Sequence, residues 1–461
     1  MERTEIVSLF KNTPADGTEI TVCGWAKNIR DSKNIGFIAL SDGGCFKTLQ
    51  VVLEAGKLAN YDEVIHTGLY SSLRVKGKLV LTPQAKQPFE LNADSVEILG
   101  DCPADEYPLQ KKKMSMEYLR TMPTLRPRTN TFNAAFRVRS AAAYAIHKFF
   151  QENGFVYSHS PLLTSSDCEG AGEMFRVTTL DLENVPKNED GTVDYTQDFF
   201  EKPVNLTVSG QLEAEAMAMA FGKVYTFGPT FRAEKSFTTR HAAEFWMIEP
   251  EMAFCDLSGY MDTAEAMTKY VIRYVLDNCP DEMAFFNQFI DKAHRASGAG
   301  GKLRVWPHQL HRGHRDPEEE QQEVPVPRGV GRGHPDRARA LPDRGGVQKA
   351  CVRHRLPEGD QELLHEAEPG RQDRGSRRYA GARHRRADRR QQREENYDKL
   401  VARMDELGMD KTNYDWYLNL RKFGGVEHAG YGLGFERMIM YLTGIQNIRD
   451  VLPFPRTAYG F

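Results

Sequence analysis

The sequence predicts an α+β protein, with an N-terminal OB-type β-barrel followed by a larger domain built on an antiparallel sheet flanked by helices. Three features predict this fold. Short segments of alternating apolar and polar residues fill the first hundred positions, an amphipathic helix follows, and an arginine-bearing hairpin and a glycine-rich strand come later. We divide the 461 residues into a barrel over 1–102, a hinge over 103–130 and a second domain over 131–461.

Composition excludes a membrane protein and wholesale disorder. The chain has 61 Lys and Arg against 64 Asp and Glu, with 40% apolar residues, and no apolar run approaches the ~20 residues that cross a bilayer. The N-terminus, MERTEIVSLF, has no signal-peptide or transit-peptide character, so we expect a cytoplasmic protein. Its seven scattered cysteines form no CxxC pair, and we expect reduced thiols, not a disulfide framework or a zinc cluster.

The barrel prediction rests on about five strand-like segments within residues 18–100, separated by turn residues. OB barrels commonly bind single-stranded nucleic acid by stacking bases on aromatic rings beside basic side chains. Arg30, Phe37 and Gln50 could supply a cation, a ring and an amide on such a face. The pattern alone also allows Phe37 to be a core residue and Arg30 a solvated one.

An amphipathic helix is predicted after the hinge, in AAFRVRSAAAYAIHKFFQENGF. Asn153 and Gly154 form a C-cap signal, and the chain then continues as FVYSHSP. Pro161 in this segment is typical of an edge strand or a turn.

A β-hairpin is predicted in YTFGPTFRAEKSFTTRHAAEFWMIEPEMAF, with strands over 225–233 and 244–254 and a cationic loop between them. Its polar residues could hold phosphates and its ring a purine, because preorganised cations stabilise charge at phosphorus. An Arg and Glu pair on a hairpin could equally be a solvated cross-strand pair. The candidates are Arg232, Glu234, Lys235, Arg240, His241 and Phe245.

A glycine-rich strand and a helix are predicted in HAGYGLGFERMIMYLTG near the C-terminus. Gly430, Gly432 and Gly434 recur at every second residue, which is typical of a strand covered closely by a flat ligand. Glu436 and Arg437 then open the helix, where an arginine is well placed for a phosphate. The glycine spacing differs from a dinucleotide fingerprint, and no Walker A sequence occurs, so Rossmann and P-loop chemistry are excluded.

Together, FRAE, TTRHAAEF and GYGLGFER resemble motifs 2 and 3 of the class II aminoacyl-tRNA synthetases, and the helix ending in GFVYSHSP resembles motif 1. With GWAKNIRD, GFIALSD and LQVV the chain resembles the subclass that carries an OB anticodon-binding barrel, namely the aspartyl, asparaginyl and lysyl enzymes. EGAGEMF, SGQLEAE, EFWMIEPE, WYLNLRKFG and IQNIRDVLPFPR are most similar to the asparaginyl branch. The similarity covers about 1–292 and 393–461, and it makes 131–461 a class II catalytic domain.

The resemblance implies ATP-dependent ligation of asparagine to tRNA through an aminoacyl-adenylate, with Mg²⁺ beside the ATP phosphates. It makes the arginines of motifs 2 and 3 catalytic and implies a homodimer with Pro161 at its interface. The implied residues are Arg232 and Arg437 for catalysis; these two with Glu234, Arg240, His241, Phe245, Gly434 and Glu436 for ATP; Glu173, Gln211, Arg393 and Arg421 for the amino acid; and Arg30, Phe37 and Gln50 for the anticodon.

Three other interpretations stay open on the sequence. The chain could be an aspartyl enzyme, including a non-discriminating one that charges two tRNAs, because this choice depends on whether the pocket meets an amide or a carboxylate. It could be a non-catalytic relative that only binds tRNA. A relative without a barrel that makes asparagine itself is disfavoured by residues 18–100.

Residues 293–392 differ in composition from the rest. This window holds 20 of the 38 Arg, has no Ile, Phe, Met, Asn or Thr, and carries 22 Lys and Arg against 14 Asp and Glu, whereas the remainder carries 39 against 50. We see no strand alternation or helical period in it, and a basic arm, a disordered insert and an out-of-frame segment are all possible.

The resemblance favours the out-of-frame reading. The family has a strand with an acidic Mg²⁺ ligand and a Gly-Gly-Ser run just before QREE, where this chain reads RHRRADRRQQREE. The window therefore replaces a strand instead of adding length, and two compensating frame shifts explain this. Loss of an inner strand would leave unpaired backbone groups and no carboxylate for the metal, so we expect poor folding and weak or absent activation of asparagine. Asp388 among four arginines is more simply a charge-paired surface residue than a substitute ligand.

Translating the underlying DNA in the other two frames tests this hypothesis. We expect one frame to give a strand-like segment with a Glu and a Gly-Gly-Ser run just before Gln392. If neither frame does so across 293–392, two compensating frame shifts are the wrong explanation.

Overall fold

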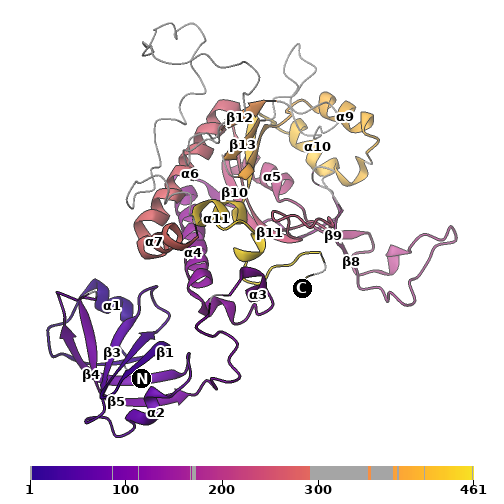
Figure 1. Ribbon diagram of the computed structural model, residues 1–461. Helices are drawn as coiled ribbons and strands as arrows, with labels where there is room; N and C mark the ends of the chain where they lie inside the picture. Colours follow the sequence, from indigo (N-terminus) through magenta and orange to yellow (C-terminus); the bar gives the residue numbers. More distant parts are fainter. Residues whose placement is uncertain are drawn as a thin grey trace, which may run out of the picture. The chain divides into compact units, whose positions relative to one another are not determined.

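The computed structural model forms two compact units, residues 1–134 and 135–461 (Figure 1). Within residues 351–354, 377–381 and 384–392 only the backbone is described. The structure describes residues 3–85, 87–112, 114–166, 168, 173–290, 351–354, 377–381, 384–409, 411–458 and 460.

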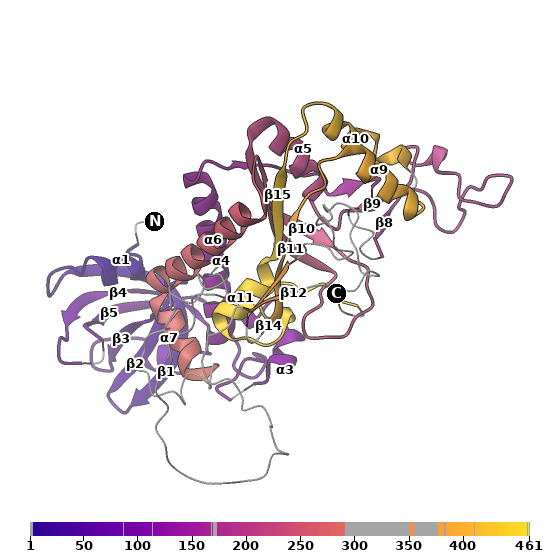
Figure 2. The ribbon, with the colours of Figure 1, turned by 90° about the horizontal axis from the view of Figure 1, so that it is seen from above.

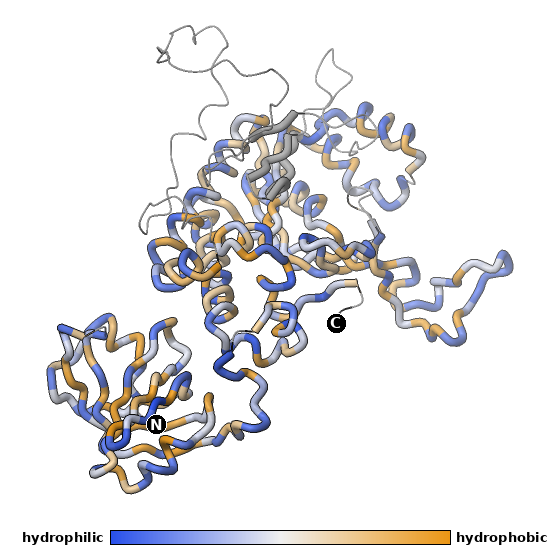
Figure 3. The backbone as a smooth tube through the Cα atoms, in the orientation of Figure 1, coloured by the Kyte–Doolittle hydropathy of each residue, from blue (hydrophilic) through white to orange (hydrophobic). Residues whose placement is uncertain are grey.

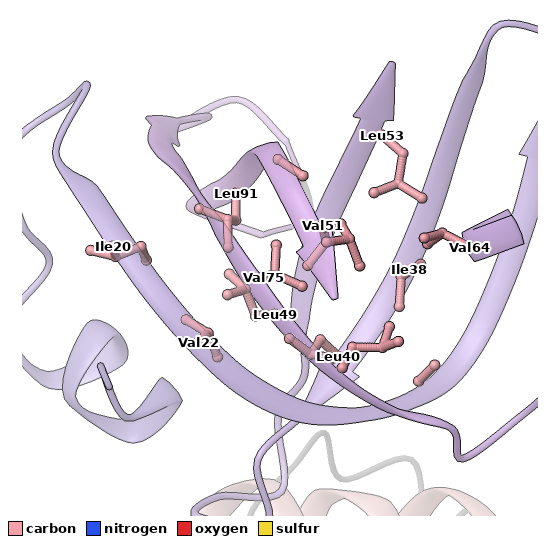
Figure 4. Packing of buried hydrophobic residues seen from close by; sticks show 14 of the residues in the cluster. Ile20, Val22, Ile38, Leu40, Leu49, Val51, Leu53, Val64, Val75 and Leu91 are labelled. Atoms are coloured by element: carbon pink, nitrogen blue, oxygen red, sulfur yellow. The ribbon is translucent and has the colours of Figure 1, made fainter. Parts of the chain in front are cut away.

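The first unit contains the predicted barrel. Five strands close in the order β1-β2-β3-β5-β4, which confirms the OB-type prediction. Alternate side chains fill the interior, among them Val22, Ile38 and Val51, each fully buried (Figure 4). The elements are α1 (Ile6–Lys11), β1 (Glu19–Ser32), β2 (Ile35–Ser41), β3 (Leu49–Glu54), α2 (Tyr61–Ile65), β4 (Ser72–Leu81) and β5 (Phe89–Gly100).

The segment that we interpreted as a hinge packs on the barrel. The backbone N–H of Cys102 donates to Ser71 Oγ at 2.9 Å, and Lys111 Nζ donates to the carbonyl oxygen of Ile29 at 3.2 Å. Tyr107 and Leu109 are buried. The segment, which includes α3 (Met116–Arg120), therefore belongs to the first unit up to residue 134.

The second unit is built on a seven-stranded sheet in the order β12-β13-β14-β15-β11-β10-β6. The predicted hairpin is confirmed: β10 and β11 pair antiparallel, with Phe231 opposite Glu244. The glycine-rich strand β15 lies on the other side of β11, with Gly434 opposite Met247. The strands are β6 (Val156–Tyr157), β10 (Lys223–Phe231), β11 (Glu244–Ala253), β12 (Cys351–His354), β13 (Arg377–Gly381), β14 (His384–Gln392) and β15 (His428–Gly434).

Helices α4 (Asn130–Glu152), α6 (Leu257–Asn278) and α11 (Phe435–Thr443) cover one face of this sheet (Figure 2). The ring of Phe150 stacks on Tyr225 at 4.5 Å, and Phe227 contacts Phe435 at 5.0 Å. Hydrophobic positions alternate with polar ones along these helices (Figure 3). This face is therefore the apolar core of the second unit.

A second layer of helices packs on the opposite face of the sheet. Gly430, Gly432 and Gly434 of β15 lie on this same face. Helices α5 (Gln211–Phe221), α9 (Tyr397–Glu406) and α10 (Asp415–Lys422) pack there around Leu212, Leu400 and Tyr417. The remaining elements are α7 (Pro280–Phe289) and a small sheet of β7 (Leu163–Thr164), β9 (Val204–Leu206) and β8 (Arg176–Val177).

Our expectation that residues 293–392 contain no strand, and that the sheet lacks an inner one, is wrong for the backbone. Strand β14 pairs with β15, with Asp388 opposite Leu433 and Gln392 opposite Ala429, and β13 and β12 continue the sheet. Ladder hydrogen bonds involve only main-chain groups, so an unpaired edge of β15 accepts an extended chain of almost any composition. The roles considered for the side chain of Asp388 lie outside the described residues.

Within the described residues, no helix is long and apolar enough to cross a membrane. Their cysteines form no disulfide, as the sequence predicted, although Cys351 is described only in its backbone.

Candidate functional site

Arg232 and Phe245 lie together where the hairpin strands meet the cationic loop. The backbone N–H of Arg232 donates to the carbonyl oxygen of Ala243 at 2.9 Å, which extends the β10 and β11 ladder. The guanidinium of Arg232 lies over the Phe245 ring at 5.5 Å. Its Nε is buried and meets no hydrogen-bonding partner among the described residues, so this arginine retains a donor for an incoming acceptor.

The loop between β10 and β11 brings the other predicted polar residues close in sequence to Arg232. Glu234 is exposed, whereas Arg240 and His241 are partly buried, and Thr238 holds the His241 ring through its hydroxyl. Glu173 reaches this region through its backbone, because the N–H of Ala233 donates to its carbonyl oxygen at 2.7 Å. The segment carrying Glu173 therefore borders the hairpin.

The start of α11 lies beside the same end of β11. Gly434 is the N-cap of the helix and Arg437 lies within its first turn, partly buried. Glu436 is held inside the protein, since one oxygen accepts from Arg139 Nη2 at 2.8 Å and the other from the N–H of Trp246 at 3.0 Å. Both carboxylate oxygens thus have protein donors, and Glu436 ties α11 to α4 and to β11.

A buried polar cluster unites three of the four residues predicted for the amino acid, Glu173 being the exception. Its centre is Glu215 of α5, which sequence reasoning missed and which is fully buried. Its Oε1 accepts from Gln211 Nε2 at 3.0 Å and lies 3.5 Å from Arg393 Nε. Its Oε2 accepts from Arg421 Nη2 at 2.9 Å. Gln211, Arg393 and Arg421, far apart in sequence, are therefore brought together by one carboxylate.

A second buried carboxylate, Glu251 of β11, completes the cluster. Arg393 binds both of its oxygens, with Nε at 3.3 Å from Oε2 and Nη2 bonded to Oε1. Burial raises the pKa of Glu251 above its usual value, because Arg393 is shared with Glu215 and offsets burial only in part. Burial would also raise the pKa of Glu215, but Arg421, His428 and Arg393 outweigh it and hold this pKa below its usual range.

Neighbouring side chains of the protein explain why two of the three alternate positions of β15 require glycine. A Cβ on Gly430 would overlap the carboxylate of Glu251, and one on Gly432 would lie 2.8 Å from Met247 Cε. Gly434 is different, because a Cβ there would meet only Arg437 side-chain carbons at 3.8 Å. Our interpretation that a flat ligand requires all three glycines is therefore replaced at Gly430 and Gly432 by packing within the protein.

Sequence reasoning missed Glu215, Glu251, Tyr417 and His428. Glu215 and Glu251 lay within blocks quoted for the resemblance, SGQLEAE and EFWMIEPE, but nothing local separates Glu215 from Glu213. Their signal is tertiary: only the fold shows that Glu215 shares Arg393 with Glu251. Glu249 is likewise buried, and neutral donors from Ser209, Gly210 and Thr226 satisfy it.

On the barrel, the predicted anticodon residues share the outer surface of β1, β2 and β3. Arg30 pairs with Phe37 across β1 and β2, and its guanidinium lies over the ring at 5.6 Å. Gln50 Nε2 donates to Glu90 Oε2 at 3.0 Å. Phe37 alternates with buried Ile38, so it points away from the core, unlike in the alternative that we left open.

No group of three or more His, Cys, Asp or Glu that could hold a metal occurs among the described residues. The buried carboxylates Glu215 and Glu251 of the cluster, and Glu249 and Glu436 outside it, already have protein donors. The described residues therefore do not form a dedicated Mg²⁺ site.

Comparison with known proteins gives two family matches. The family of class II tRNA synthetases (D, K and N) matches residues 115–304 and 390–458, and the OB-fold nucleic acid binding domain matches 20–99. The gap in the first match falls inside the window of unusual composition.

Curated relatives and solved structures agree with these matches. The chain is 49% identical over 489 residues to an asparagine–tRNA ligase of Clostridium kluyveri and 51% identical over 478 residues to one of Desulfitobacterium hafniense, covering 99% of each chain in both cases. Its fold is similar to asparaginyl-tRNA synthetase from Pyrococcus horikoshii complexed with asparaginyl-adenylate, with a TM-score of 0.76 at 22% identity over 100% of this chain and 99% of that chain.

The glycine contacts give a prediction that separates packing from ligand binding. Gly430→Ala should destabilise the protein by about 1–3 kcal/mol, because its methyl group displaces Glu251 and Arg393. Gly434→Ala is the matched control and should change stability by less than ~0.5 kcal/mol. Urea unfolding measures both, and equal losses would contradict the packing account.

Proposed function

We propose that this chain, which belongs to the class II tRNA synthetases of the D, K and N group, joins asparagine to tRNA with ATP. Relatives of about half-identical sequence over almost the whole length are named asparagine–tRNA ligases, which disfavours the aspartyl and the non-catalytic alternatives. One observation carries the proposal for this site. The cationic end of the hairpin and the buried polar cluster, which we propose for the substrate amino acid, lie along the same strand, β11.

The proposed ATP site is the end of β11 next to the loop. Side chains at alternate positions of a strand share one face, so Phe245, Met247, Glu249 and Glu251 lie on the face of Gly434 and Gly430. Arg232 lies over Phe245, and Arg437 follows Gly434 in the adjacent helix. We infer that Phe245 takes the adenine and that the two arginines take the phosphates, with Arg240, His241 and Glu234 beside them.

The proposed amino-acid site is the buried cluster further along β11. A carboxamide presents an N–H₂ group that donates and a carbonyl oxygen that accepts, so it needs an acceptor and a donor in the pocket. Ionised Glu215 and Arg393, 3.5 Å apart, offer this pair. Aspartate would place a second carboxylate against Glu215, which is unfavourable in a buried site. Gln211 and the segment of Glu173 are proposed for the α-amino end, and Arg421, bonded to Glu215, supports the pocket from behind.

The proposed reaction has two steps. The α-carboxylate of asparagine attacks the α-phosphorus of ATP, and pyrophosphate leaves. A ribose hydroxyl at the tRNA 3′ end then attacks the carbonyl carbon of the anhydride, and AMP leaves. The protein contributes positioning and fixed positive charge from Arg232 and Arg437, which stabilise the charge that develops at phosphorus. Mg²⁺ would enter with the ATP phosphates, and we assign it no protein ligand.

The barrel and the surface near α4 support the proposed partners. Arg30, Phe37 and Gln50 form an outward-facing set suited to unpaired bases, so we assign them to the anticodon. Val156, Tyr157 and Leu163 are about 40% exposed close to Pro161, as expected for a surface that a second copy covers. The proposed assembly is therefore a homodimer that binds tRNA.

Amino-acid-dependent exchange between ATP and pyrophosphate tests the proposed activity. We expect exchange with asparagine, and a fall of about 100-fold in the Arg232→Ala and Arg437→Ala variants, because each removes a charged donor. Arg403→Ala, which removes a partly exposed pair with Glu406, is the control.

The assay should include this chain and a version with residues 293–392 restored in frame, since the window adjoins Arg393. Exchange stimulated by aspartate and not by asparagine, or no exchange in either version, would refute the assignment.

Sedimentation of the chain with and without labelled tRNA tests the partners. The free chain should sediment at twice its mass of 52.4 kDa, and it should bind tRNA in a salt-dependent manner. Arg30→Ala should weaken tRNA binding about tenfold without altering the mass of the free chain. A monomeric mass would contradict the homodimer, and unchanged tRNA binding would contradict the role of Arg30.

A further inference from the structure

Three donors converge on a single oxygen of Glu215. Tyr417 donates its hydroxyl to Oε2 at 2.6 Å, Arg421 Nη2 lies at 2.9 Å, and His428 Nε2 lies at 3.1 Å. Tyr417 and His428 are each 1% exposed, so neither is in reach of bulk water. The Tyr417 hydroxyl accepts from Arg421 Nη2 at 2.7 Å, which leaves its own proton for Glu215.

Both ring nitrogens of His428 lie against oxygen atoms. Nδ1 lies 2.8 Å from the carbonyl oxygen of Val426, and Nε2 lies 3.1 Å from Oε2 of Glu215, a carboxylate that Arg421 and Arg393 also bind. The ring of His428 is therefore held between the backbone of Val426 and the buried carboxylate.

The polar groups that face Glu215 come from several elements. Gln211 is its neighbour on α5, Glu251 comes from β11, Arg393 precedes α9, Tyr417 and Arg421 come from α10, and His428 comes from β15. Two arginines and the polar side chains of Gln211, Tyr417 and His428 thus surround two carboxylates. Loss of one donor at Oε2 weakens the stabilisation of the ionised form and makes a protonated Glu215 more accessible.

We propose that Tyr417 and His428 are positioning residues that hold Glu215 as an ionised acceptor for the side-chain amide of asparagine, and that they thereby set the preference for asparagine over aspartate. The inference rests on the proposed function. An ionised Glu215 accepts from the amide N–H₂ and repels a carboxylate. A protonated Glu215 would instead donate to the carboxylate of aspartate, so the two substrates would become less distinct.

Binding of asparagine and of aspartate to Tyr417→Phe and His428→Gln, measured by calorimetry, tests the proposal. Tyr417→Phe removes one donor, and His428→Gln removes the imidazole ring but keeps a side-chain donor. We expect the ratio of the two dissociation constants to move toward aspartate by about tenfold in Tyr417→Phe, as for loss of one hydrogen bond to a charged group, and to shift the same way in His428→Gln.

Tyr225→Phe is the matched control. Tyr225 is also fully buried, and its hydroxyl bonds His147 Nδ1 at 2.8 Å, but it lies on the opposite face of the sheet. This variant should lose stability without a change in the ratio. An unchanged ratio in Tyr417→Phe, or an equal change in Tyr225→Phe, would overturn the positioning role and leave the proposed function intact. Failure of both the parent chain and a version with residues 293–392 restored in frame to bind either amino acid would overturn both.

Discussion

The site depends on one buried carboxylate, that of Glu215. A charge removed from water is tolerated only where opposite charges and hydrogen bonds satisfy it. Glu215 meets this requirement with donors from α5, the segment before α9, α10 and β15. Because these elements are distant in sequence, the same interactions that stabilise the ion also hold these elements together around it.

The antiparallel register of β10, β11 and β15 places side chains that are distant in sequence on one face of the sheet. Side chains alternate between faces, so one face of β11 carries Phe245 and Glu251, and the other packs on helices through Ile248. Glycine at 430 leaves room for the Glu251 carboxylate, and this close approach allows Arg393 to reach it. A one-residue shift of register would bury the polar set in the helical core.

Strand β14 illustrates how differently backbone and side chains constrain a fold. Its sequence is rich in arginine and departs from the family, yet its backbone pairs with β15 because main-chain hydrogen bonds do not depend on side-chain identity. The chemistry of a site does depend on side chains. The sheet can therefore keep its topology while the contribution of this strand to catalysis changes.

The barrel, the hairpin and the late helix could be predicted from the sequence, because their signals are local: period-two alternation, turn residues and the positions of Arg232 and Arg437. The resemblance supplied the family and most of the candidate residues. The absence of a strand near 388 was an expectation that local composition favoured and packing did not follow.

Tertiary structure alone decided that Glu436 faces Arg139 and Trp246, and that Glu215 is the centre of the buried polar cluster. These roles depend on the direction of a side chain and on partners up to hundreds of residues away. Such contacts cannot be recognised in a single sequence, since the residues around Glu215 in the chain are those expected around any glutamate on a helix.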